Sequence, residues 1–127
     1  MTLLTAAEVI GFAPSTDLER SRRFYGDVLG LEVAEVTPFA CVLRGGNAMI
    51  RVTAVESLVP QPFTVLGWTV SDIAGTVAEL VARGVEFRRY DGMGQDEDGV
   101  WTTPGGDKIA WFTDPDANVL SLTEFSA

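Results

Sequence analysis

The sequence predicts an α+β fold made of two βαβββ modules. Three observations predict it: an internal repeat, two amphipathic helical patterns that each follow a short apolar strand, and several short strands after each helix. The repeated helical segments are PSTDLERSRRFYGDVLGLEV at 14–33 and TVSDIAGTVAELVARGVEF at 69–87, which align Asp17 with Asp72. The chain is therefore predicted to be one domain, 1–127, of two similar halves.

A second repeated phrase links the two halves. GGNAMIRVT at 45–53 is similar to GGDKIAWFT at 105–113, and this alignment places Arg51 opposite Trp111. The two copies of this phrase are further apart in the sequence than the two helical segments are. Module two must therefore contain extra residues between its helix and the phrase. We assign them to 91–99 (DGMGQDEDG), whose glycines and acidic side chains are typical of a mobile surface loop.

Module one, about 8–58, begins with the apolar strand 8–13 (EVIGFA). Thr16 stands three residues before Glu19, which is the spacing of a capping box, and it predicts the start of a helix. Gly30 is expected to end that helix, because glycine adopts a left-handed backbone at low cost. One face of the helix is predicted to pack on the sheet: Leu18, Ser21, Tyr25, Val28 and Leu29. Three strands follow at about 31–36, 39–44 and 47–55.

Module two, about 63–125, repeats this order after the strand 63–70 (FTVLGWTV). Ser71 or Asp72 is predicted to cap the second helix, and Gly84 to end it. The apolar face of this helix is Ile73, Val77, Leu80 and Val81. Strands are predicted at about 85–90, 99–103, 107–113 and 118–124, with the second and third of these paired as a hairpin.

The composition excludes several classes of function. The chain has 127 residues, with 9 basic and 18 acidic side chains and a net charge of −9, so it would repel a nucleic-acid backbone. It has no histidine, which excludes a mechanism that needs imidazole. Long apolar runs and a signal-peptide pattern are absent, and the single cysteine, Cys41, is expected to be buried and inert. These features predict a cytoplasmic protein that interacts with neither nucleic acid nor membranes.

Both ends of the chain resemble a known family. STDLERSRRFYGDVLGLEV at 15–33 is similar to the opening signature of the vicinal oxygen chelate superfamily, and WFTDPDANVLSLTEF at 111–125 is similar to its closing phrase, Phe-x-Asp-Pro-Asp-Gly-Asn and an alternating strand. The superfamily includes glyoxalases, bleomycin-resistance proteins and extradiol dioxygenases. The resemblance implies that the two modules form a cupped mixed sheet with the helices on its outer faces, a small-molecule ligand inside and a homodimeric assembly.

The resemblance also places the family's metal-ligand positions at Ile10, Val65 and Ser121. Isoleucine and valine carry no donor atom, and a neutral hydroxyl is a poor ligand, so this chain resembles a metal-free branch that holds no cofactor. The carboxylates of 96–98 lack the spacing of a calcium-binding loop and are expected to be solvated.

Strand alternation from these positions predicts which side chains face the ligand. Trp111 stands three residues before Asp-Pro-Asp, a position that lies in the active site of the fosfomycin-resistance relatives, and the repeat makes Arg51 its counterpart. An indole stacks on planar or cationic groups and a guanidinium binds carboxylates, but core packing of Trp111 and a salt bridge of Arg51 stay open as alternatives. The predicted ligand-binding residues are Phe12, Met49, Arg51, Trp101, Ile109, Trp111 and Ser121.

Two further aromatic residues receive other roles. Trp68 alternates onto the helix side of its strand and is predicted to pack in the core, whereas Tyr90 stands at the start of 91–99 and is a candidate lid residue. Alternation leaves the facing of Trp101 undecided.

More than one function is compatible with these features. The first hypothesis is a metal-independent protein that sequesters a small aromatic or cationic compound, as the bleomycin-resistance branch does, with no catalytic residue. The alternative is a metal-independent or vestigial enzyme that uses Glu8, Asp91 or Glu124 as a general acid or base, with its pKa raised inside an apolar cup. A regulatory or purely structural domain is a third possibility, and the identity of the ligand is left open.

Overall fold

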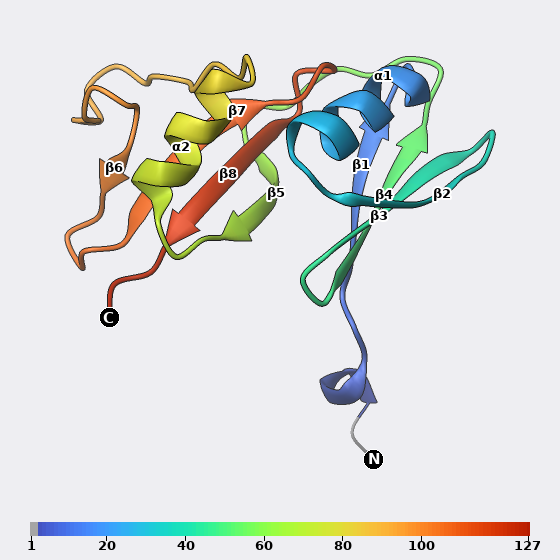
Figure 1. The fold of residues 1–127 in the computed structure, drawn as a ribbon, viewed down its shortest axis with the longest axis horizontal. Coiled ribbons are helices and arrows are strands. Elements are labelled where there is room, and N and C mark those ends of the chain that lie inside the picture. The colour runs from blue at the N-terminus through green and yellow to red at the C-terminus, as the bar shows by residue number, and fades with distance from the viewer. Residues whose placement is uncertain (1–2) are drawn as a thin grey trace. The chain divides into compact units, whose positions relative to one another are not determined.

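The computed structural model describes residues 3–127, so the first two residues of the predicted domain lie outside the described part. The chain divides into two units, Met1–Val59 and Pro60–Ala127. Figure 1 shows a helix and a sheet in each unit. Among the described residues, no helix combines the length and the apolar character needed to cross a lipid bilayer.

The first unit opens with the 3-10 helix η1 and continues as strand, helix and three strands. Its elements are η1 (Leu3–Ala6), β1 (Ile10–Ser15), α1 (Leu18–Arg22), the π-helical continuation η2 (Arg23–Val28), β2 (Glu32–Val36), β3 (Ala40–Gly45) and β4 (Ala48–Ala54). The strand order is β1-β4-β3-β2, with β1 parallel to β4 and the other pairs antiparallel. Helix α1 packs on β3 and β4.

The second unit repeats the same architecture. Its elements are β5 (Thr64–Thr69), α2 (Ile73–Ala82), β6 (Trp101–Thr102), β7 (Lys108–Thr113) and β8 (Val119–Glu124). The strand order β5-β8-β7-β6 matches that of the first unit, again with one parallel pair, β5 and β8. The predicted α+β fold of two βαβββ modules is confirmed, and each module has its own four-stranded mixed sheet.

The helix starts are set by aspartate side chains. Asp72 accepts a hydrogen bond from the backbone N–H of Gly75, which confirms it as the cap of α2. The capping box at Thr16 and Glu19 is wrong, because Asp17 is the N-cap of α1. Glu19 instead accepts two hydrogen bonds from Arg22, at 2.7 and 3.1 Å, which lower the pKa of its carboxyl group.

Apolar side chains on one face of each sheet form the core with the helix above them. In the first unit the largest fully buried side chains include Tyr25 of η2 and Leu43 of β3, and in the second they include Phe112 of β7 and Ile73 of α2. The predicted apolar face of α2 is confirmed except at Val81, whose side chain is 53% exposed. The buried residues of α2 are at positions 73, 77 and 80, which define the face that packs on the sheet. Position 81 lies beside that face and not on it.

Cys41 is buried in the first sheet, as predicted, and its burial raises the pKa of the thiol. A raised thiol pKa leaves less reactive thiolate at pH 8, and the surrounding core blocks access. We therefore expect the native protein to react with a disulfide reagent such as Ellman's reagent at least about tenfold more slowly than the protein in urea. Equal rates in the two conditions would show that the thiol is accessible.

The strand predicted at 85–90 is wrong. Only Phe87 forms a bridge in this segment, to Phe112 of β7. The backbone N–H of Tyr90 is bonded instead to the side chain of Gln95, at 2.6 Å, and the same side chain donates to the carbonyl oxygen of Arg88, at 2.9 Å. The backbone groups that a strand would use are therefore occupied by a side chain.

Because 85–90 is not a strand, the alignment of the two modules that the Gly-Gly phrase predicted is also wrong. By their places in the two sheets, β4 is equivalent to β8 and β3 to β7, whereas the Gly-Gly phrase aligned β4 with β7. Arg51 is paired with Phe12 as Ser121 is paired with Gly67, so Ser121 is the structural counterpart of Arg51. Trp111, which pairs with Ser121, therefore corresponds to a residue of β3 and not to Arg51.

Candidate functional site

The face of the second sheet that is opposite α2, here called the open face, collects most of the predicted ligand-binding residues. Helix α2 packs on β7 and β8, and the buried side chains Ala110 and Phe112 point toward it. Alternation therefore places Ile109 and Trp111 on the open face, and Trp111 is paired there with Ser121 of β8. Trp101 is paired with Ile109, which settles its facing as well.

Three aromatic rings form a continuous row on this face, here called the aromatic row: Trp101, Trp111 and Tyr90. The ring centroids of Trp101 and Trp111 are 6.3 Å apart with an interplanar angle of 26°, and the rings are stacked. Tyr90 packs edge-on against Trp111, with centroids 5.5 Å apart and an angle of 89°. Rings that pack on one another in this way form an apolar aromatic cluster that a planar ligand can contact.

Trp68 lies on the other side of the sheet. Its ring stacks on Phe112, with centroids 6.4 Å apart, and Phe112 also packs against Phe87 at 5.3 Å. The three rings belong to the layer that α2 covers. This placement agrees with the prediction that Trp68 is a core residue.

Arg88 extends the aromatic row at its Tyr90 end. The guanidinium carbon lies 6.0 Å from the centroid of the Tyr90 ring, and the backbone N–H of Arg88 donates to the carbonyl oxygen of Trp111 at 2.7 Å. Within residues 3–127 no carboxylate forms an ion pair with Arg88.

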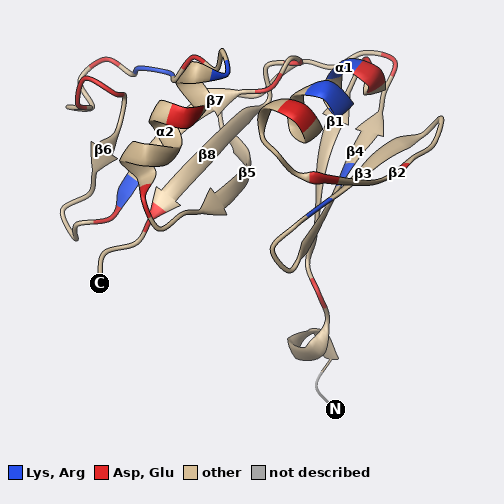
Figure 2. Cartoon of the chain, in the orientation of Figure 1, with Lys and Arg blue, Asp and Glu red and all other residues tan. Residues whose placement is uncertain are grey.

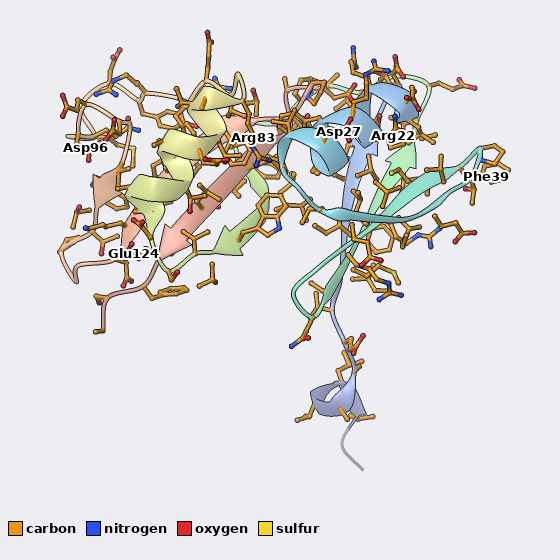
Figure 3. The ribbon with its side chains drawn as sticks, in the orientation of Figure 1. Arg22, Asp27, Phe39, Arg83, Asp96 and Glu124 are labelled. Carbon is orange, nitrogen blue, oxygen red and sulfur yellow. The ribbon has the colours of Figure 1, made fainter. Side chains whose placement is uncertain are left out.

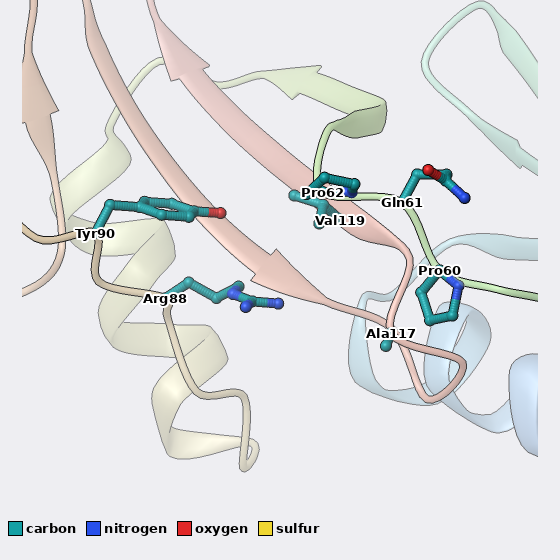
Figure 4. A pocket seen from close by; sticks show the side chains of 7 residues that line it. All are labelled: Pro60, Gln61, Pro62, Arg88, Tyr90, Ala117 and Val119. Carbon is teal, nitrogen blue, oxygen red and sulfur yellow. The ribbon is translucent and has the colours of Figure 1, made fainter.

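A pocket of about 290 Å³ opens beside Arg88 and Tyr90. Figure 4 shows the Tyr90 ring and the Arg88 side chain extending side by side toward it, with Pro62 and Val119 across from them. Gln61 and the neighbouring prolines come from the segment before β5, and Ala117 from the turn before β8. The pocket is thus built entirely from the second unit.

The loop 91–99 holds Arg88 and Tyr90 in place. Gln95 bonds to the backbone of both residues and also donates to the carbonyl oxygen of Gly99, at 2.7 Å. The guanidinium of Arg89 donates to the backbone carbonyl oxygens of Asp96 and Glu97. The side chain of Gln95 thus connects this loop, which the sequence predicts to be a surface loop, to two residues of the site.

The first unit carries the remaining predicted residues on the corresponding face of its own sheet. Met49 and Arg51 alternate with buried residues of β4 and are paired with Ile10 and Phe12 of β1. Phe12 is 59% exposed, and within the described residues no ion pair joins Arg51 to a carboxylate. The salt-bridge alternative for Arg51 is therefore not observed.

Sequence reasoning missed Arg88 and the pocket residues. The pattern VEFRRY predicts a strand at about 85–90, and no role was predicted for its arginines. The one available signal was the presence of two tryptophans, Trp101 and Trp111, in the predicted hairpin, but the sequence did not show that they share a face. The position of Tyr90 beside Trp111 depends on the hydrogen bond from the backbone N–H of Arg88 to the carbonyl oxygen of Trp111. The pattern of apolar residues does not reveal this long-range contact.

The positions at which the family places metal ligands do not fit a metal ion. Ile10 and Val65 have no donor atoms, and the hydroxyl of Ser121 lies over Gly67, where an added Cβ would be 2.7 Å from it. Across residues 3–127, no three His, Cys, Asp or Glu side chains gather closely enough to hold a metal.

One of the candidate general acids and bases, Glu124, contacts helix α2. Figure 3 shows Glu124 at the end of β8, beside the start of α2, and its carboxylate accepts a hydrogen bond of 2.9 Å from the backbone N–H of Ile73. Glu124 therefore caps the helix and faces away from the open face. Glu8 and Asp91 are exposed to solvent.

Comparisons with known proteins agree with this architecture. Residues 9–122 match the model of the Glyoxalase/Bleomycin resistance protein/Dioxygenase superfamily. No curated protein matches the sequence significantly.

Three solved structures illustrate the likeness in fold. A member of the glyoxalase/bleomycin resistance protein/dioxygenase superfamily from Sphaerobacter thermophilus is 22% identical, with a TM-score of 0.73 over 96% of this chain and 99% of that one. TnmS3, an antibiotic binding protein from Streptomyces sp. CB03234, is 23% identical, with a TM-score of 0.73 over 95% of this chain and 97% of that one. Lactoylglutathione lyase from Agrobacterium tumefaciens is 16% identical, with a TM-score of 0.72 over 94% and 93%.

Proposed function

The chain belongs to the Glyoxalase/Bleomycin resistance protein/Dioxygenase superfamily, and from that premise we propose that it is a metal-independent protein that binds a small planar aromatic molecule. The ligand lies on the open face of the second sheet, against the aromatic row. The observation that carries this proposal is the row itself: Trp101, Trp111 and Tyr90 pack on one another on the face that the helix leaves uncovered.

The chemistry of the surrounding residues supports binding more than catalysis. Ser121 and Ile109, the neighbours of Trp111 on this face, provide a hydroxyl and an apolar surface but no group that titrates near neutral pH. Glu124, a candidate general acid, is committed to the start of α2. One structural neighbour, TnmS3, is an antibiotic binding protein, which supports a role in sequestering a compound and in resistance to it.

We also propose, from the sequence, that the protein acts in the cytoplasm as a homodimer. The free, buried thiol of Cys41 is compatible with a reducing compartment. Sedimentation velocity measures the dimer directly.

Tryptophan fluorescence tests the proposed site. The neutral probe 9-anthracenemethanol is expected to quench the emission of the protein, because it stacks on Trp111 and accepts excitation energy. Replacement of Trp111 by alanine removes the centre of the aromatic row and is expected to weaken binding at least about tenfold, or about 1.4 kcal/mol.

Trp68→Phe is the matched control, since Trp68 stacks on Phe112 in the layer under α2. This variant is expected to retain the affinity for the probe. If Trp111→Ala binds as tightly as the unchanged protein, or if Trp68→Phe abolishes the response, the ligand does not lie on the open face.

A further inference from the structure

The charge of the residues around the pocket selects among aromatic ligands. We propose that the preferred ligand is a planar aromatic anion, such as an aromatic carboxylate or an acidic phenol, whose negative group is bound by Arg88. This inference rests on the proposed function, and it replaces the open choice between aromatic and cationic compounds with a single class.

The first support is the lining of the pocket. Arg88 is the one charged residue among those that line it, and the others are prolines, an alanine, a valine, a glutamine and a tyrosine. Figure 4 shows the guanidinium directed along the pocket below the Tyr90 hydroxyl. A planar guanidinium binds a carboxylate through two parallel hydrogen bonds, and a phenol hydroxyl adds a third donor.

The second support is that Arg88 differs from the neighbouring arginines. Arg83 forms an ion pair with Glu79 at 3.1 Å, and Arg89 donates to carbonyl oxygens of the loop. Among the described residues, Arg88 has a ring contact with Tyr90 but neither an ion pair nor a side-chain hydrogen bond. Its donors are available to an incoming anion.

The third support is the placement of the carboxylates. Figure 2 shows β5, β7 and β8 as uncharged strands except near their ends, at Lys108 and Glu124. Glu124 bonds to the start of α2, and Asp114 is 5% exposed and bonds to its own turn. No carboxylate lines the pocket. A cationic ligand would therefore be repelled by Arg88 and would find no negative group to bind it.

The fourth support is that Arg88 is held in position from both sides. Its backbone N–H bonds to Trp111, and its carbonyl oxygen accepts from Gln95, which also binds the N–H of Tyr90. The backbone of Arg88 is therefore held beside Trp111 and Tyr90, and its side chain contacts the Tyr90 ring. A ligand with a ring and an acidic group at a matching distance gains both contacts without rearrangement of the backbone.

The test uses three probes that share one aromatic core and differ in charge: anthracene-9-carboxylate, 9-anthracenemethanol and 9-anthracenylmethylammonium. Binding is followed by quenching of tryptophan emission. The carboxylate is expected to bind at least about tenfold more tightly than the ammonium. Arg88→Gln is expected to abolish this preference, measured as the ratio of the affinities for the carboxylate and the ammonium, and circular dichroism with thermal unfolding shows that the variant is folded.

Arg83→Gln is the matched control, because it removes a cation of the same unit that is already paired with Glu79, and it is expected to retain the preference. Equal or tighter binding of the ammonium, or an unchanged preference in Arg88→Gln, would overturn the inference. If all three probes bind equally through Trp111, the aromatic site stands and the anionic class fails. If none of the three binds, the proposed function fails together with it.

Discussion

Replacement of Phe112 by alanine is expected to lower the free energy of unfolding by about 4 kcal/mol, within the range for a fully buried phenylalanine. The Phe112 side chain is inaccessible to solvent and packs between Phe87 and Trp68 in the layer that α2 covers. Its removal leaves a cavity that the two remaining rings fill only in part. Urea denaturation followed by circular dichroism measures the loss.

Trp111→Ala is the informative comparison, because Trp111 precedes Phe112 on β7 and points to the opposite face. It loses the contacts with Trp101 and Tyr90, and we expect a loss of stability of about 1 to 2 kcal/mol together with the loss of probe binding. A destabilisation by Trp111→Ala that equals that of Phe112→Ala would identify the indole as a core residue and remove the basis of the proposed site.

Replacement of Asp114 by alanine is expected to cost about 3 kcal/mol of stability. The buried Asp114 carboxylate accepts hydrogen bonds from the backbone N–H groups of Asp116 and Asn118, at 2.9 Å each, and from the Asn118 amide, at 2.8 Å. Removal of the carboxylate leaves buried donors unsatisfied, which costs more than the hydrogen bonds themselves gain. The turn also carries Ala117 into the pocket, so probe binding is expected to weaken as well.

Two variants of the same turn serve as controls for this result. Asp114→Asn keeps an oxygen for the two backbone donors and is expected to lose about half as much stability as Asp114→Ala. Ala117→Gly is expected to stabilise the protein by about 1 kcal/mol, because Ala117 has a φ of 66°, where a side chain is strained. Thermal unfolding ranks the three variants by stability. If Asp114→Ala is as stable as Asp114→Asn, the carboxylate does not have the proposed role.

The parts of the fold that depend on local chemistry were predictable from the sequence. Asp72 caps α2, and Gly30 and Gly84 have the positive φ values, 78° and 95°, that end a helix. Strand alternation correctly predicted that Ile109 and Trp111 share one face of their strand, because it depends only on the two-residue period of a strand.

The alignment of the modules failed for a reason that is also local. The phrase with two glycines marks a tight hairpin turn in each module, where Gly46 and Gly106 have positive φ values of 56° and 96°. The turn lies between β3 and β4 in the first module but between β6 and β7 in the second. The similar turns therefore led to the wrong alignment of β4 with β7. The wrongly predicted strand at 85–90 supported this alignment, because it gave module two the same number of strands before the turn.

The residues that shape the pocket depend on contacts between distant parts of the chain. Arg88 reaches its place through the carbonyl oxygen of Trp111 and the side chain of Gln95, and neither contact follows from the pattern of apolar residues. The face of Trp101 became clear only from its pairing with Ile109. A single sequence predicts which way a strand side chain alternates, but not which loop residue lies beside it.

The bonds of Gln95 and Arg89 have a consequence for the kinetics of binding. The conformational entropy of the segment 91–99 is lost when the protein folds, so little further ordering accompanies the arrival of a ligand. For the proposed ligand we therefore expect an association rate that rises in proportion to ligand concentration, without the plateau that a slow closing step would impose. Differences in residence time among ligands arise mainly from how quickly each one leaves the rings.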